Sequence, residues 1–388
     1  MARSWSLKLL RLGVGAVALL GASAIAAGCG DDSSSGSTDT EVSCDNLTRP
    51  VNDAYCHESC EITQSCSLAQ TRPIDACCVL LKAPPKQVDS PFLARTNDTK
   101  DYAGDGPPNL SCFEPANYPT AGQSKTVTID GLVKIFSKGC DSKNVAIEIW
   151  TVKRTGGADD GMPDQLIGSP VIITGEEEFE VEDNKNCPDG RIAYKYSYPN
   201  VPTYTELMFK TYAANSQGAW ATYYEYNLYI SEDDPDFDAS TDTYHRNVRV
   251  VASDDYQTIP QAAIGRTITQ GNGALAGEIH DCDNVRLQNA VVDVNVSRTS
   301  MVFFTPDEDG PLPDTARTQI GSTGRLGLYA ALDVAPGPVR VSAIGLRDNG
   351  TPEGELVSLG YFDARVFPDA VTSVTLRGLR PFQVPNAE

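Results

Sequence analysis

The sequence is poor in basic residues, histidine, methionine and tryptophan. Its 388 residues include 31 Lys and Arg against 52 Asp and Glu, which gives a formal net charge of −21. Nucleic-acid binding requires a basic surface, so this balance excludes DNA or RNA as the expected partner. Hydrophobic residues make up 40% of the chain. That fraction is enough to fill cores, and the length exceeds that of one ordinary domain.

The common catalytic signatures are also missing. The three histidines are His57, His245 and His280, and none begins a metal-binding His-x-x-Glu motif. The sequence has no Gly-x-Ser-x-Gly elbow and no Gly-Lys dipeptide of a phosphate-binding loop. We therefore predict no catalytic residues and no cofactor. A carboxylate pair for glycoside hydrolysis stays open because Asp and Glu are abundant.

The uncharged apolar run at the N-terminus is a poor membrane span. It covers residues 12–28, follows three basic residues and is rich in Gly and Ala, which favours a signal peptide over 1–28. The run ends in Ala26-Ala27-Gly28-Cys29, which resembles the lipobox of bacterial lipoproteins, with Ala26 where Leu is usual. The resemblance implies lipidation of Cys29 and, with Gly30 next, an outer-membrane lipoprotein. The alternative is an ordinary signal peptide with Cys29 in a disulfide.

A flexible tether and a cysteine-rich module are expected to follow. Residues 29–43 are mostly Gly, Ser, Thr and Asp and favour a solvated tether. In an exported protein, cysteines at the density of the module at 44–120 normally form disulfides. Zinc binding by Cys56, His57, Cys60 and Cys66 is the disfavoured alternative, because the two-residue knuckle is missing, and no metal site is predicted. The disulfide candidates are Cys44, Cys56, Cys60, Cys66, Cys77, Cys78, Cys112, Cys140, Cys187 and Cys282.

The distribution of these cysteines leaves the pairing open. Seven lie in the module at 44–120 and three lie beyond it. Both groups are odd, so either one bridge crosses a domain boundary or two thiols stay free.

An internal repeat predicts two β-sandwiches. Residues 131–149 and 277–294 share a Gly-bearing first segment, a Cys-Asp pair, and an Asn that precedes a half-buried strand of alternating apolar residues. In the second copy, Pro336-Gly337 precedes a Val-rich strand. This pattern resembles the carboxypeptidase regulatory-like, or transthyretin-like, β-sandwich family. An immunoglobulin-like sandwich with another strand order is the alternative.

The predicted fold class is therefore mainly β. The resemblance implies two tandem antiparallel transthyretin-like sandwiches, at 121–252 and 272–380, preceded by a small, disulfide-rich and partly helical head. Residues 253–271 are expected to link the two sandwiches, and residues 381–388 form a tail.

Tyrosines concentrate in the first of these sandwiches. Nine of the sixteen lie between Tyr194 and Tyr229. In the predicted strand 220–230 the even positions are the more apolar. The odd positions place Tyr223, Glu225, Asn227 and Tyr229 on the opposite face. These four residues either reflect the common occurrence of Tyr in half-buried strands or form an exposed platform for a sugar or peptide.

Two acidic loops have spacings that only partly suit calcium. They are Asp234-x-Asp236-x-Asp238 and Asp307-Glu308-Asp309-Gly310, and we interpret them as solvated turns because the first lacks the Gly and Glu of a calcium loop.

Together these features predict a non-enzymatic surface lipoprotein, held on the membrane by its lipid. It would serve in adhesion or scaffolding, or bind an extracellular polysaccharide or envelope protein. The alternatives are a carbohydrate-binding accessory module of an extracellular degradation system, and a hydrolase with an unrecognised carboxylate site.

Overall fold

The computed structural model describes residues 90–383 except 115–116, 118–121, 137, 216–217, 297 and 353. All described residues belong to one compact unit, Thr40–Glu388. Before residue 90 only four short strands are described, in which β1 pairs with β3 and β2 with β4. The predicted signal peptide and Cys29 lie outside the described residues, as do most of the tether and of the cysteine-rich module. The four strands are β1 (Val42–Ser43), β2 (Tyr55–Cys56), β3 (Ser65–Cys66) and β4 (Cys78–Val79).

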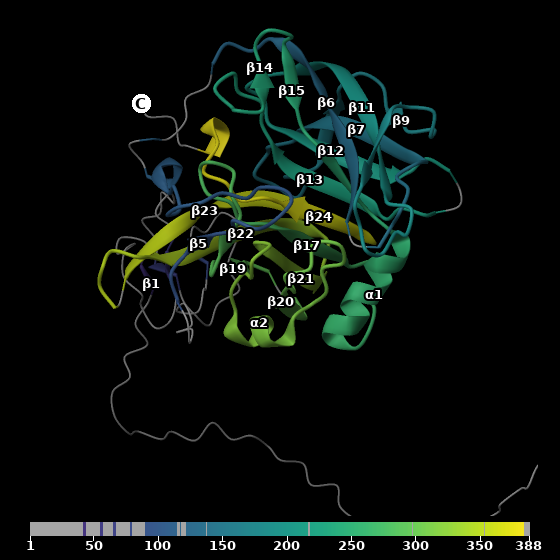
Figure 1. Ribbon diagram of the computed structural model, residues 1–388. Helices are drawn as coiled ribbons and strands as arrows, with labels where there is room; N and C mark the ends of the chain where they lie inside the picture. Colours follow the sequence, from purple (N-terminus) through teal and green to yellow (C-terminus); the bar gives the residue numbers. More distant parts are fainter. Residues whose placement is uncertain are drawn as a thin grey trace, which may run out of the picture. The chain divides into compact units, whose positions relative to one another are not determined.

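The first half of the described chain is a sandwich of two sheet layers, in the upper part of Figure 1. One layer has the order β10-β11-β6-β15-β14, with β16 also paired to β6, and the other contains β13-β12-β7 with β8 and β9 on β7. Ile129, Ile147 and Phe209 fill the core between the layers. The strands are β6 (Thr126–Phe136), β7 (Val145–Val152), β8 (Pro163–Leu166), β9 (Val171–Ile172), β10 (Phe179–Glu182), β11 (Arg191–Pro202), β12 (Leu207–Ala213), β13 (Thr222–Leu228), β14 (Phe237–Asp238), β15 (Thr243–His245) and β16 (Val248–Val251).

The second half packs a three-stranded sheet, β19-β22-β23, against β20-β21-β17-β24. Leu275, Tyr329, Val341 and Phe362 belong to the core of this half. The strands are β17 (Gly273–Glu278), β18 (Leu287–Gln288), β19 (Val291–Val294), β20 (Ser300–Phe303), β21 (Leu328–Val334), β22 (Gly337–Arg347), β23 (Glu355–Val366) and β24 (Ala370–Val374); β18 pairs with β5 (Ala94–Arg95). Short 3-10 helices cover Ser111–Phe113 and Pro381–Gln383, and α2 covers Thr315–Ile320.

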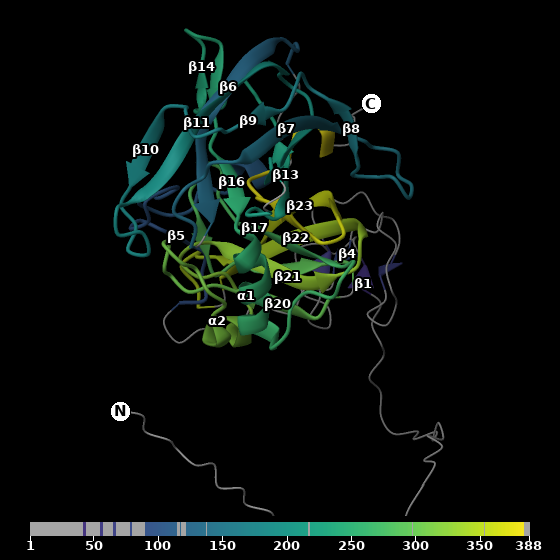
Figure 2. The same cartoon turned by 90° about the vertical axis from the view of Figure 1, so that its right-hand side faces the viewer.

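One continuous sheet joins the two halves. Its order is β20-β21-β17-β24-β13-β12-β7-β8, so β24, the last strand among the described residues, lies between β17 of the second half and β13 of the first. Strand β24 runs parallel to both neighbours. Figure 1 shows β13, β24 and β17 side by side, and Figure 2 shows β13 and β17 from another direction. The prediction of a mainly β fold is confirmed. The halves are fused through this sheet, and several of the pairings are parallel where an antiparallel sandwich was expected.

The internal repeat has a counterpart in the backbone. Asn144 and Asn289, which precede β7 and β19, have φ angles of 60° and 68°, a left-handed conformation that Asn tolerates better than most residues. The expectation of a half-buried strand is wrong for β7, because Ala146 and Glu148 are buried as well as Val145 and Ile147.

Residues 253–271, predicted to be a linker, contain a packed helix. Helix α1 covers Ser253–Ile264, has two Asp residues in its first turn, and ends at Gly265 with φ 74°. Ile259 packs against Phe304 and Leu328 of the second half. The turn signals of the segment therefore mark the end of a helix that covers one face of the long sheet.

Two disulfides lie among the described residues. Cys140 pairs with Cys187 inside the first half, and Cys112 pairs with Cys282 of the second half. The second pair is a bridge that crosses a predicted domain boundary, which is one of the two alternatives that the cysteine count allows.

Candidate functional site

A cavity of about 100 Å³ lies where the two halves meet, and we call it the interface cavity. Strands β6, β13 and β16 of the first half line it, together with β17, β21, β24 and α1 of the second. Part of its lining is apolar and formed by small or branched side chains, while a polar part carries charged residues from both halves. The lining includes Tyr223, Glu225, Arg246, Arg249, Tyr256, Ala274, Ala276, Glu278, His280, Leu328 and Leu332.

Glu278 is the centre of a buried charge cluster beside the cavity. It ends β17 and is 5% exposed. Its Oε2 accepts a hydrogen bond from Nε of Arg286 at 3.1 Å and lies 2.7 Å from Nε2 of His280. Its Oε1 lies 3.0 Å from Nη2 of Arg249. Because Arg249 belongs to β16 and Glu278 to β17, this ion pair connects the two halves.

Burial and the surrounding charges perturb both titratable partners in this cluster. Burial acts to raise the pKa of Glu278, but Arg286 and Arg249, with the His280 hydrogen bond, hold it well below its usual value. Burial lowers the pKa of His280, an effect that Glu278 and Asn284 only partly oppose. The ring of His280 also lies against Tyr102, with 4.8 Å between centroids. At neutral pH the cluster therefore holds an ionised Glu278 and a neutral His280.

A second ion pair faces the same cavity with its hydrogen-bonding capacity unfilled. Nη2 of Arg246 donates to Oε1 of Glu225 at 2.5 Å. Oε2 of Glu225, Nε of Arg246 and the hydroxyl of Tyr256 are all buried without a hydrogen-bond partner. Burial also raises the pKa of Tyr256 to about 12. Buried polar atoms in native proteins are nearly always paired, so these three atoms mark positions in the cavity where a water or a polar group of a ligand can bind.

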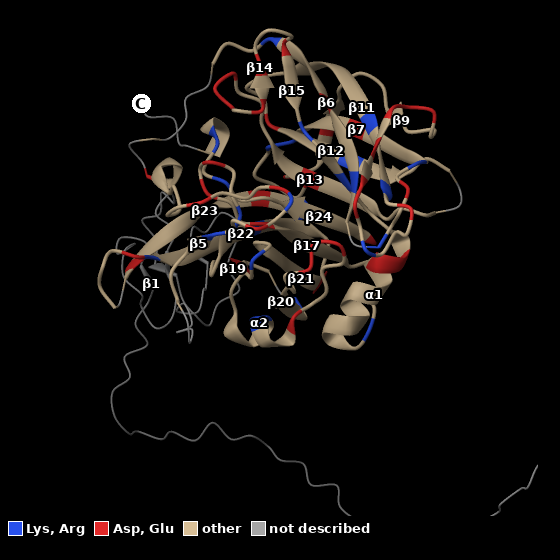
Figure 3. Ribbon diagram, in the orientation of Figure 1, with Lys and Arg blue, Asp and Glu red and all other residues tan. Residues whose placement is uncertain are grey.

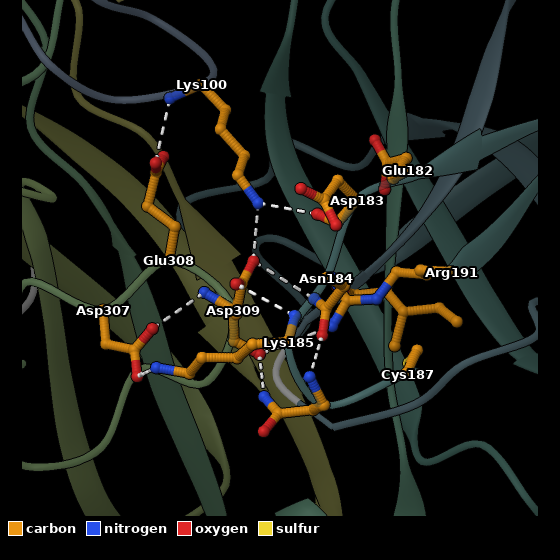
Figure 4. A network of polar contacts seen from close by, with 12 residues as sticks. Lys100, Glu182, Asp183, Asn184, Lys185, Cys187, Arg191, Asp307, Glu308 and Asp309 are labelled. Carbon is orange, nitrogen blue, oxygen red and sulfur yellow. Dashed lines mark hydrogen bonds and ion pairs between the residues drawn. The ribbon is translucent and has the colours of Figure 1, made fainter. Parts of the chain in front are cut away.

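A polar network surrounds the acidic loop at 307–309 (Figure 4). Nζ of Lys100 lies 2.6 Å from Oδ1 of Asp309, and its backbone N–H donates to Glu308 Oε2 at 2.9 Å. The other Glu308 oxygen accepts from Arg286 Nη1 at 3.0 Å. Lys185 pairs with Asp307. This network borders a second cavity of about 80 Å³, which shares Arg249 and Glu278 with the first.

The expectation of solvated acidic turns is wrong in part. The loop at 307–309 binds lysines and an arginine of other segments, and the side chain of Asp234 is only 5% exposed and pairs with Arg377. Among the residues that the structure describes, no group of three or more His, Cys, Asp or Glu is placed to hold a metal ion. Figure 3 shows acidic residues on many loops of the ribbon, with basic residues dispersed among them.

The predicted Tyr platform is not an exposed surface. Tyr223, Glu225, Asn227 and Tyr229 are 6%, 5%, 7% and 4% exposed. Tyr223 and Glu225 line the interface cavity. The C-terminal segment covers the other two, because Asn227 accepts from Arg380 Nε at 2.9 Å and Tyr229 lies against Phe382.

Packing and backbone irregularity explain this burial. Tyr223 packs with Val251, Val371 and Tyr256 of α1, and the β12–β13 register shifts between Leu207 and Phe209. Asn227 has a φ of 64°, which interrupts the alternation of faces there.

The sequence reasoning missed most of the charged residues of the site. Arg246, Arg249, Glu278 and Arg286 carried no motif. A usable signal was present in β17, where Glu278 stands between Gly277 and Ile279 at the end of an otherwise apolar strand. A carboxylate in such a strand is expected to have buried cationic partners.

No protein-family model and no curated protein matches the chain. None of the helices in the described part of the chain combines the length and apolar character needed to cross a membrane.

Proposed function

We propose that the chain is a non-enzymatic binding protein of the bacterial cell envelope, held on the outer membrane by a lipid on Cys29. The observation that carries the binding role is the interface cavity, with its three buried and unpartnered polar atoms. Its partner would be an extracellular polysaccharide or an envelope protein, part of which enters the cavity. The acidic charge of the chain disfavours nucleic acid.

Two observations support export of the chain. The disulfides Cys112–Cys282 and Cys140–Cys187 suit an oxidising compartment. The basic start, the uncharged run and the Ala-Ala-Gly-Cys29 sequence suit a lipoprotein signal. Several acyl chains on Cys29 would give stable anchoring, since a single short chain holds a protein only weakly.

The fused architecture supports a role as a firm attachment point. The sheet that runs through both halves, together with ion pairs such as Arg249–Glu278, fixes one half against the other. A tether followed by such a body suits adhesion or scaffolding, because the body transmits force without a hinge between its halves.

The anchoring part is tested with Cys29→Ala. We expect the wild-type chain to partition into the detergent phase and to label with a fatty-acid probe. The variant should stay unprocessed and unlabelled, because the acceptor thiol is gone. Cys112→Ala, which removes a cysteine of the folded body, is the matched control and should still label. A wild-type chain with a free, unacylated N-terminus would overturn the anchor.

The binding part is tested by crosslinking in intact envelopes. Wild-type chain and Ala276→Val, which fills the interface cavity, are captured from the same amount of envelope. We expect a defined partner to be enriched with wild type and depleted with the variant. Equal recovery with both would overturn binding through the cavity.

A further inference from the structure

The unpartnered atoms of the interface cavity have a chemical pattern that identifies a ligand class. Oε2 of Glu225 is an acceptor, Nε of Arg246 is a donor, and the hydroxyl of Tyr256 can act as either. The first two belong to one ion pair, which is already joined through Oε1 and Nη2. A single guest atom that both donates and accepts could therefore satisfy both members of the pair.

The cavity lining carries charges of both signs, and this balance favours a neutral guest over an ionic one. A carboxylate or phosphate would pair with Arg246 but would lie beside Glu225 and Glu278. An ammonium would pair with Glu225 but would lie beside Arg246 and Arg249. Burial strengthens both repulsions. A neutral hydroxyl avoids them, because one oxygen accepts from Arg246 and its proton goes to Glu225.

The remaining walls suit the carbon skeleton of a hydroxylated molecule. Ala274, Ala276, Leu328 and Leu332 supply apolar surface, and Tyr223 supplies an aromatic ring. The volume of about 100 Å³ is below the ~150 Å³ of a cavity that admits benzene. The guest is therefore small, or it is the end of a longer molecule that enters past the half-buried Asp101 and Tyr102.

We propose that the interface cavity binds a neutral polyhydroxyl group, held by Glu225, Arg246 and Tyr256. This inference rests on the proposed function in taking the cavity as the binding site, and it adds the chemistry of the ligand. The group could come from a free polyol or from the terminal sugar of a polysaccharide, since both present the same hydroxyls.

The first test compares probes on the full chain in detergent, by ligand-observed NMR titration. Glycerol is expected to bind with millimolar affinity, because so small a ligand makes few contacts. Its matched probe, 1-propanol, has one hydroxyl and should bind about tenfold more weakly, because a site built for hydroxyls rejects analogues that lack them. Glucose and maltotriose distinguish the sources: tighter binding of maltotriose indicates a polymer end, and binding of glycerol and glucose without maltotriose indicates a free polyol.

The second test uses matched Tyr→Phe variants. The hydroxyls of Tyr256 and Tyr229 are both buried and unpartnered, but only Tyr256 lines the cavity. Each substitution should raise Tm in the absence of ligand, because it removes an unsatisfied buried group. Only Tyr256→Phe should weaken glycerol binding, by about fivefold, the effect of one lost hydrogen bond. Ala276→Val should remove binding while the fold is kept.

Equal binding of glycerol and 1-propanol would overturn the proposal, as would equal glycerol affinity of Tyr256→Phe and Tyr229→Phe. The absence of binding by every probe would assign the cavity to water alone. These results do not depend on the lipid, because they are measured in detergent. A failure of anchoring and a failure of the hydroxyl site can therefore be told apart.

Discussion

Individual residues at the junction of the halves are charged and buried, which is unfavourable unless every charge is compensated. Glu278 meets this condition with two arginines and a histidine. Glu225 and Arg246 neutralise each other's charge, but each keeps one buried atom without a hydrogen-bond partner. Removing one member of a buried ion pair typically costs about 3–5 kcal/mol. The cluster therefore fixes the geometry of the cavity and also makes the junction sensitive to pH.

The pH dependence of stability follows from His280. Its pKa is below the usual 6.5 because the ring is buried. As the pH falls below about 6.5, the unfolded chain takes up a proton that the folded chain does not. The contribution of His280 to the free energy of unfolding should therefore be fully present above that pH. It should decrease as the pH falls toward the lowered pKa. Glu278 adds a further decrease below its usual value of 4.5, because its pKa is also lowered.

The measurement is urea unfolding of the full chain at pH 7, 6 and 5, with His280→Gln as the comparison. Gln keeps a donor near Glu278 but cannot be protonated, so the decrease between pH 7 and 5 should be smaller in the variant. An unchanged pH slope in His280→Gln would show that other groups cause the acid sensitivity.

The elements that were predictable from sequence are those whose pattern is local. The alternation in residues 145–149 and 292–296 predicts strands, which the structure places at β7 and β19, and the two Asn residues before them mark turns. The strand that pairs with each of these strands cannot be predicted from local sequence, because it can come from a distant part of the chain. Asn227 of β13 donates to the carbonyl of Thr375, which is 148 residues later in the chain. Alternation could therefore identify the odd face of 220–230 but not the segments that bury it.

The same limit applies to the site. Tyr223 and Glu225 were singled out from sequence, and they do line a cavity. Their partners Arg246 and Tyr256 were not singled out, because they come from a loop and a helix whose positions depend on the whole fold. If each sandwich were a separate domain, no interface between the halves would bury these charged residues. The sheet that joins the halves creates that interface.

Strand β24 is the element on which this fusion depends. Thr372 has no exposed surface, and its register partners are Tyr224 on one side and Leu275 on the other. Thr372→Pro should lower the free energy of unfolding by about 3 kcal/mol or more, because proline removes a ladder hydrogen bond inside the sheet.

The control is Thr372→Val, which keeps the strand and loses only the hydroxyl bond to the Arg365 carbonyl. It should cost about 1 kcal/mol. Urea unfolding followed by circular dichroism measures both. Similar losses in the two variants would argue against a central position for β24.

For the whole molecule, the shared sheet predicts that the halves cannot unfold separately. Independent tandem domains would give two transitions. Here, release of the first half would expose one edge of β24, and release of the second half would remove β24 from β13. We therefore expect one calorimetric transition for residues 90–383, with the van't Hoff enthalpy equal to the calorimetric enthalpy.

Disulfide variants turn this expectation into a sharper test. Cys140–Cys187 closes a separation of 47 residues inside the first half, and Cys112–Cys282 closes one of 170 residues. Replacing either pair with Ser should lower stability by about 2–5 kcal/mol, and the longer loop should cost about 1 kcal/mol more in the chain-entropy model. Because the halves are coupled, both double variants should shift the same single transition to lower temperature. If the Cys140→Ser/Cys187→Ser chain instead shows a new, earlier transition while the main one stays in place, the first half unfolds alone. The interface cavity would then lie between two separable domains rather than inside one cooperative body.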